Sequence, residues 1–120
     1  MSTILIADDT PSEAALMASV VQSLGHVART VADGESCLET ARTIKPALIL
    51  LDVVMPRLDG FNTCRKLKQD PELAQTPVIL VTSKNSDSDK FWGQKQGADS
   101  LVSKPFTPES LADAIKTILK

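Results

Sequence analysis

The sequence is poor in aromatic side chains and carries no excess of either charge. Tyrosine is absent, only 3% of the residues are aromatic, and 13 Lys and Arg stand against 15 Asp and Glu, which gives a formal net charge of −2 at pH 7. Nucleic-acid-binding domains usually carry a clustered positive surface, so we expect no nucleic-acid partner. No apolar run approaches the roughly 20 residues of a membrane span, and no basic leader precedes an apolar stretch. We therefore expect a cytoplasmic protein without a membrane partner.

Cysteine and histidine are also scarce, which limits the chemistry that the chain can carry. Cys37 and Cys64 each fall within a helical pattern, unlike the dense cysteine framework of a small secreted domain. We interpret both as small core residues in a reducing compartment. The single histidine, His26, precedes a predicted strand, and we expect it to be exposed rather than to act as a phosphodonor or a ligand.

The length and the hydrophobic pattern predict one α/β domain over residues 1–120. The 120 residues are 42% hydrophobic, and five short apolar segments alternate with five segments of helical periodicity. We expect strands at 3–7, 26–31, 47–51, 78–81 and 100–102, and helices that begin at Pro11, after Gly34, after residue 59, near residue 87 and at Pro108. This alternation predicts a doubly wound, five-stranded parallel sheet covered by five helices. The segment 26–31 is the most polar of the strands, so we expect it at an edge.

Two of the helices carry local signals that the structure can test. Thr10-Pro11-Ser12-Glu13 has the pattern of a capping box with proline at the first helical position. In the fourth helix, expected over 87–96, Phe91 and Trp92 are adjacent, so we expect one in the core and the other exposed. Gly93 lies within the same helix and costs about 1 kcal/mol relative to alanine, which predicts a helix that shifts easily.

Polar side chains follow several of the predicted strands at the point where each strand ends. Asp8 and Asp9 follow the first strand and Asp52 follows the third, while Thr82 and Lys104 follow the fourth and fifth. In open parallel sheets, ligands bind beyond the carboxyl ends of the strands. If the first and third strands are neighbours, three carboxylates, a hydroxyl and an ammonium group therefore meet at one edge.

This group of side chains fits phosphoryl transfer to an aspartate. Clustered carboxylates raise one another's pKa unless a cation neutralises them, and oxygen ligands of this kind suit Mg²⁺. An aspartate can act as the nucleophile while the metal, the hydroxyl and the ammonium group stabilise the transferring phosphoryl oxygens. A structural alternative is that Asp8 and Asp9 only favour the positive end of the following helix. The presence of Asp52, Thr82 and Lys104 at the same edge favours the chemical interpretation.

The chain resembles the receiver domains of two-component response regulators. The resemblance rests on Asp8-Asp9, "LLDVVMPRLDG" at 50–60, "VILVTS" at 78–83 and "SKPF" at 103–106, which occur in the family's order over essentially the whole chain. It implies a flavodoxin-like sheet with strand order 2-1-3-4-5. "KFWGQKQGA" at 90–98 is similar to the small regulators of pilus-driven twitching motility.

The resemblance also implies roles for individual residues. Asp52 would be phosphorylated, and Asp9, Asp52 and the Val54 carbonyl would bind Mg²⁺ with assistance from Asp8 through water. Thr82 and Lys104 would contact the phosphoryl group, and the peptide bond between Lys104 and Pro105 would be cis. The implied donor is a sensor histidine kinase or a phosphotransfer domain, and the implied output is docking of a target protein on the face formed by residues 87–119.

Some positions depart from the family's pattern or leave alternatives open. Leu101 occupies a position where the family often has an aromatic switch residue, and we expect Val54 and Lys84 to tune the lifetime of the phosphoryl group. Met55-Pro56 and Gly60 are expected to shape the loop after Asp52. A passive phosphate sink is one alternative function. An aspartate-nucleophile phosphohydrolase is another, although such enzymes usually carry a second Asp where this chain has Val54.

Overall fold

The fold is a parallel sheet between two layers of helices. The computed structural model describes residues 1–55 and 58–119, so the expected role of Pro56 in the loop after Asp52 lies outside the described residues. The strands are β1 (Thr3–Ala7), β2 (Val27–Val31), β3 (Leu48–Leu51), β4 (Val78–Thr82) and β5 (Ser100–Ser103). All neighbouring strands are parallel and their order is β2-β1-β3-β4-β5, which confirms the predicted sheet.

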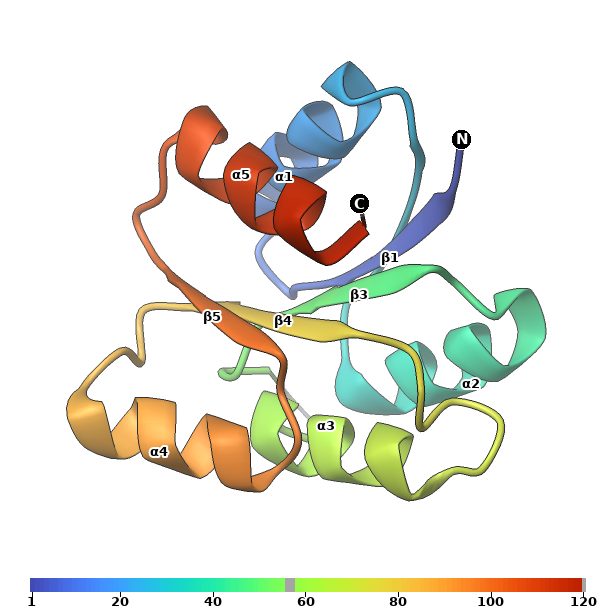
Figure 1. The fold of residues 1–120 in the computed structure, drawn as a ribbon, viewed down its shortest axis with the longest axis vertical. Helices are drawn as coiled ribbons and strands as arrows, with labels where there is room; N and C mark the ends of the chain where they lie inside the picture. Colours follow the sequence, from blue (N-terminus) through green and yellow to red (C-terminus); the bar gives the residue numbers. More distant parts are fainter. Residues whose placement is uncertain (56–57, 120) are drawn as a thin grey trace.

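Within the described residues, the first four helices connect the strands, the fifth follows the last strand, and together the helices cover both faces of the sheet (Figure 1). They are α1 (Pro11–Ser23), α2 (Gly34–Ile44), α3 (Gly60–Gln69), α4 (Asp87–Lys95) and α5 (Pro108–Leu119). Helices α1 and α5 lie on one face, and α2, α3 and α4 lie on the other. Among the described residues, no helix is long and apolar enough to cross a membrane.

The core divides into two apolar clusters because the side chains of a strand point alternately to the two faces. One cluster joins the sheet to α1 and α5, and includes Ile4, Met17 and Ile115. The other joins the sheet to α2 and α3, and includes Cys37 and Cys64, which are buried and not disulfide-bonded as predicted. Strands β3 and β4 are buried along their whole length, whereas β2 is largely exposed, as expected for an edge.

The predicted capping box at the start of α1 is wrong. The side chain of Thr10 makes no cap hydrogen bond; instead its backbone N–H donates to Asp8 Oδ1 at 2.9 Å. The Glu13 carboxylate accepts a hydrogen bond from Lys104 Nζ at 2.9 Å, so it does not reach back to the N-cap. A charge-assisted bond to an ammonium group is stronger than a bond to a neutral backbone N–H.

The prediction for Phe91 and Trp92 is also wrong, because neither side chain is in the core. Their exposed fractions are 58% and 52%, and the buried residue of α4 is Gly93. A Cβ atom at Gly93 would lie 2.8 Å from Leu80 Cδ1. The glycine therefore lets α4 pack closely against Leu80 of β4, while the rings of Phe91 and Trp92 remain at the surface.

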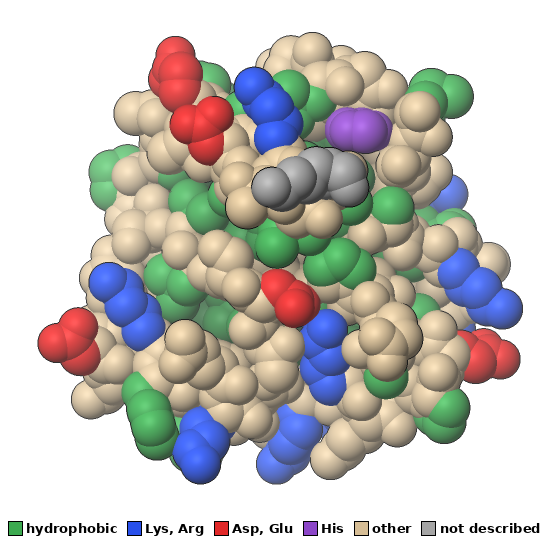
Figure 2. Space-filling view, in the orientation of Figure 1, with side chains coloured by type: hydrophobic (Ala, Val, Ile, Leu, Met, Phe, Trp, Pro, Cys, Tyr) green, Lys and Arg blue, Asp and Glu red, His purple; other side chains and the backbone are tan. Residues whose placement is uncertain are grey.

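The surface shows no single-signed patch on the face drawn in Figure 2, where Lys and Arg side chains are interspersed with Asp and Glu. His26 lies immediately before β2 and is partly buried, whereas we expected it to be exposed. Its Nδ1 accepts a hydrogen bond from the backbone N–H of Ser2 at 3.1 Å, so it has a structural partner at the N-terminal end of the sheet.

Candidate functional site

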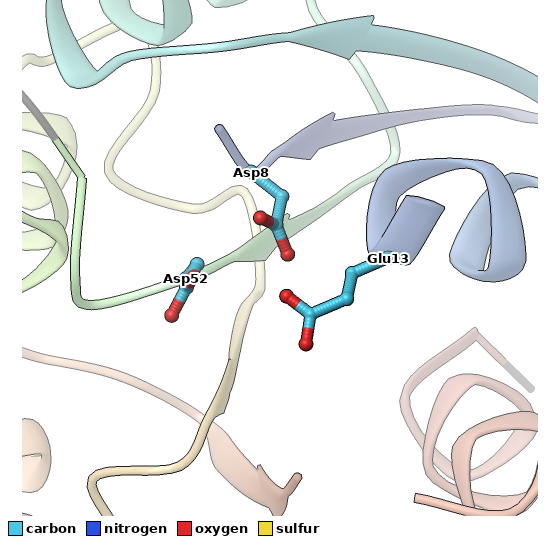
Figure 3. Close-up of side chains that lie close together, drawn as sticks. All are labelled: Asp8, Glu13 and Asp52. Atoms are coloured by element: carbon cyan, nitrogen blue, oxygen red, sulfur yellow. The ribbon is translucent and has the colours of Figure 1, made fainter. Parts of the chain in front are cut away.

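The sheet topology brings the predicted site residues to one edge. Strands β1 and β3 are neighbours with Ala7 opposite Leu51, so Asp8 and Asp52 emerge side by side. The Asp52 backbone N–H donates to the Ala7 carbonyl at 2.9 Å, which fixes this register at the edge. Figure 3 shows both carboxylates, together with that of Glu13 from the start of α1, around a common space.

Lys104 lies at the centre of this group. Its ammonium nitrogen is 2.7 Å from Asp8 Oδ2, 2.9 Å from Glu13 Oε2 and 3.2 Å from Asp52 Oδ2. The Lys104 backbone N–H donates to the Thr82 carbonyl at 3.0 Å, which continues the β4–β5 ladder and places the side chain over the edge. The peptide bond between Lys104 and Pro105 is cis, as the resemblance implied.

Glu13 is the functional candidate that the sequence analysis missed as a site residue. It was assigned to a capping box because it stands three residues after Thr10. The sequence did contain a signal, because Glu13 follows Asp9 by only a few residues. The chain turns sharply after β1, so a carboxylate in the first turn of α1 faces the same edge of the sheet as Asp8 and Asp9. In the structure it joins Asp8 and Asp52.

The surroundings raise the pKa of both Asp52 and Lys104 above their ordinary values. Burial raises the pKa of Asp52; the Lys104 charge opposes this, and the Asp8 carboxylate adds to it. Burial lowers the pKa of Lys104, but hydrogen bonds to Asp8 and Glu13 and the charge of Asp52 outweigh it, so the pKa lies above its ordinary value. Lys104 is therefore held as a cation beside the Asp52 carboxyl group.

The loop after Asp52 returns closely to the backbone of Asp52 because α3 begins with a glycine. The Gly60 N–H donates to the Val53 carbonyl at 2.8 Å. A Cβ atom at Gly60 would lie 2.2 Å from the Asp52 carbonyl oxygen and 2.6 Å from the Val53 Cα. Only glycine permits this approach, so Gly60 shapes the site through the backbone, as expected.

The remaining predicted residues lie at or beside the same cleft. A cavity of about 520 Å³ is lined by Asp9, Thr10, Glu13, Asp52, Val54, Ser83, Lys104 and Pro105. Asp9 and Val54 are exposed at its rim, and the Val54 N–H donates to Asp52 Oδ1 at 3.3 Å. Thr82 is buried, and its hydroxyl accepts a hydrogen bond from the Lys84 N–H at 3.1 Å. Ser83 lines the cleft although the sequence analysis assigned it no role.

The charges and donor atoms of the cleft fit a hard divalent cation. Carboxylate oxygens of Asp8, Glu13 and Asp52 lie within 4.8 Å of one another. One ammonium group faces these three carboxylates, so an excess of negative charge remains. Oxygen-only ligands and an uncompensated negative charge are what Mg²⁺ requires.

Comparisons with known proteins agree with this geometry. A family model described as the response regulator receiver domain matches residues 4–116. Protein PilH of Pseudomonas aeruginosa is 39% identical over 119 residues, which are 99% of this chain and 98% of that protein. The chain spans about half the length of several other relatives, whose names describe transcriptional regulators or a DNA-binding response regulator.

Solved structures show the same fold. A putative response regulator from Chloroflexus aurantiacus has a TM-score of 0.94 at 31% identity, with 98% of this chain and 97% of that chain covered. The chemotaxis protein CheY4 of Vibrio cholerae has a TM-score of 0.93 at 29% identity, with 98% of each chain covered.

Proposed function

The chain belongs to the response regulator receiver domain family, and from this premise we propose that it accepts a phosphoryl group on Asp52 and signals by docking to a target protein. The observation that carries the proposal is the Lys104 ammonium group, which lies 3.2 Å from the Asp52 carboxylate within an acidic cleft. This supports the proposal, because a fixed cation beside Asp52 would stabilise the charge that develops on a transferring phosphoryl group.

In the proposed reaction, an Asp52 carboxylate oxygen attacks the phosphorus of a phosphohistidine on a sensor kinase or phosphotransfer domain. The new P–O bond forms as the P–N bond breaks, and the leaving imidazole nitrogen keeps the electron pair. Lys104 stabilises the phosphoryl oxygens by its charge, and the Thr82 hydroxyl donates to one of them. Hydrolysis then returns Asp52 to its free form: water attacks phosphorus, the bond between phosphorus and the Asp52 oxygen breaks, and inorganic phosphate leaves.

We assign the proposed Mg²⁺ site to Asp8, Asp9, Asp52 and the Val54 backbone carbonyl. Asp8 and Asp52 are part of the close carboxylate group, and Asp9 and Val54 line the same cleft. When bound, Mg²⁺ neutralises negative charge on the phosphoryl oxygens and so favours their approach to Asp52.

The proposed output is protein docking rather than catalysis on a small substrate. Beyond phosphoryl transfer to Asp52 and its hydrolysis, we propose no enzymatic activity. The exposed Phe91 and Trp92 lie within the 87–119 face proposed for the target. The likeness to Protein PilH along nearly the full length of both chains supports a role in the control of pilus-driven motility. We propose that the protein acts in the cytoplasm.

The test is incubation with Mg²⁺ and acetyl phosphate, followed by intact-protein mass measurement. The wild type should gain one phosphoryl group that alkali removes, and chelation of Mg²⁺ should prevent the gain. Asp52→Asn should remain unlabelled, whereas Asp113→Asn, which removes an exposed carboxylate on α5, should be labelled normally. Rapid turnover of small phosphate esters would instead indicate a phosphohydrolase and overturn the proposal.

A further inference from the structure

The hydrogen-bonding capacity of Lys104 is fully used by carboxylates. An ammonium group has three N–H donors, and Lys104 Nζ lies within hydrogen-bond distance of one oxygen from each of Asp8, Glu13 and Asp52. In the free protein no donor is left over. When Asp52 becomes phosphorylated, the donor that faces Asp52 can pass to a phosphoryl oxygen, but a second contact between Lys104 and the phosphoryl group requires the release of Asp8 or Glu13.

Exposure decides which carboxylate can be released at the lower cost. The Asp8 side chain is 0% exposed, and its other oxygen already accepts the N–H of Thr10. The Glu13 side chain is 41% exposed and extends from the first turn of α1. A carboxylate that leaves an ion pair needs water or another donor, and only Glu13 can turn into solvent without rearranging the edge of the sheet.

We propose that Glu13 is a positioning residue that holds Lys104 while Asp52 is free and competes with the phosphoryl group for it. The inference rests on the proposed phosphorylation of Asp52. In the free protein, Glu13 and Asp8 fix the ammonium group beside Asp52. In the phosphorylated protein, Lys104 turns from Glu13 to the phosphoryl oxygens, and the Glu13 carboxylate, now beside a second anion, is repelled into solvent. Glu13 thereby sets how tightly the cleft holds a phosphoryl group.

The sign of the effect follows from the competition. Neutralising Glu13 frees one Lys104 donor and removes a negative charge near the incoming group, so phosphoryl binding should become tighter. If Glu13 served mainly as a metal ligand, or if Lys104 needed it to stay in place, the same change would weaken binding. The direction of the change therefore separates these roles.

The experiment is calorimetric titration with beryllofluoride, a mimic of the phosphoryl group, at Mg²⁺ concentrations that saturate each variant. Glu13→Gln should bind about two- to fivefold more tightly than the wild type, the range for a half-exposed ion pair. Glu13→Asp keeps the charge but shortens the side chain by one methylene, and it should bind with an affinity between these two. Thermal unfolding of each variant checks that the fold is retained.

Glu109→Gln is the matched control, because Glu109 also stands in the first turn of a helix that begins with proline, and is exposed. It should bind beryllofluoride like the wild type. Equal or weaker binding by Glu13→Gln would overturn the role of Glu13, and so would wild-type affinity in Glu13→Asp, because charge alone would then explain the effect. If the wild type binds no beryllofluoride, the proposed phosphorylation of Asp52 fails instead.

Discussion

Helices α1 and α4 both begin at the carboxyl edge of the sheet, but they are held there in different ways. Helix α1 buries Ala14, Met17, Val20 and Val21, and its first turn is tied to the site by the bond between Glu13 and Lys104. Helix α4 buries only Gly93. Its N-terminus is closed by its own capping box, in which Ser86 and Asp89 bond to each other's backbone N–H groups.

The difference indicates which side of the site is fixed and which can move. Burial of apolar surface stabilises the packing of a helix by roughly 25 cal/mol for each Å². Helix α1 buries four apolar side chains, whereas the buried residue of α4 is a glycine, which has no side chain to bury. A cavity of about 400 Å³ also borders α4, lined in part by Lys90, Gly93 and Leu101. We therefore expect α1 to hold the proposed phosphoacceptor site in place and α4 to move when Asp52 is phosphorylated.

The largest expected contrast is between the alanine substitutions of two glycines, one beside Asp52 and one in α4. Gly60→Ala should lower the free energy of unfolding by about 2 kcal/mol or more and abolish labelling of Asp52, because the added methyl meets the backbone of Asp52 and Val53. Gly93→Ala should change stability by less than about 1 kcal/mol, because its methyl meets the movable end of Leu80 and alanine favours the helix. Urea unfolding of both variants measures the contrast, and equal losses would contradict it.

These contrasts show how far sequence reasoning reaches. Alternating strands and helices predict the sheet, and residues at strand ends predict that Asp8, Asp52 and Lys104 meet, because both follow from the geometry of parallel sheets. The role of Glu13 could not be predicted from its local pattern, because its partner Lys104 lies 91 residues away. The exposure of both Phe91 and Trp92 depends on how closely Gly93 approaches Leu80. This distance between helix and strand cannot be predicted from helical periodicity.

A second prediction concerns the charge of Asp52, on the side of the site that α1 holds in place. Burial raises the pKa of Asp52 above its usual 3.8 in spite of Lys104, with Asp8 adding to the rise. A carboxyl group whose pKa is higher in the folded than in the unfolded chain makes folding less favourable as the pH rises through these two values. Asp52→Asn should therefore melt at a higher temperature than the wild type at neutral pH, and the advantage should shrink as the pH falls to 3.8. An advantage that grows toward acid pH would contradict this sign.

The smallest expected effect is a change in the fluorescence of Trp92, which lies on α4. Trp92 is the only tryptophan, lies on α4 and is about half exposed. Addition of Mg²⁺ and beryllofluoride should change its emission in the wild type because α4 shifts, and should leave Asp52→Asn unchanged. Flat emission in a wild-type sample whose binding is confirmed by calorimetry would mean that α4 does not respond and that docking uses another face.

The most direct test of the account asks which carboxylate of the cleft carries the phosphoryl group. After reaction with acetyl phosphate and Mg²⁺, borohydride reduction marks the acyl phosphate permanently, and peptide mass spectrometry locates the modified residue. The account predicts modification at Asp52 alone, with Asp8, Asp9 and Glu13 unmodified. Modification at any of these three, or persistent labelling of Asp52→Asn, would contradict the assignment of Asp52 as the phosphoacceptor.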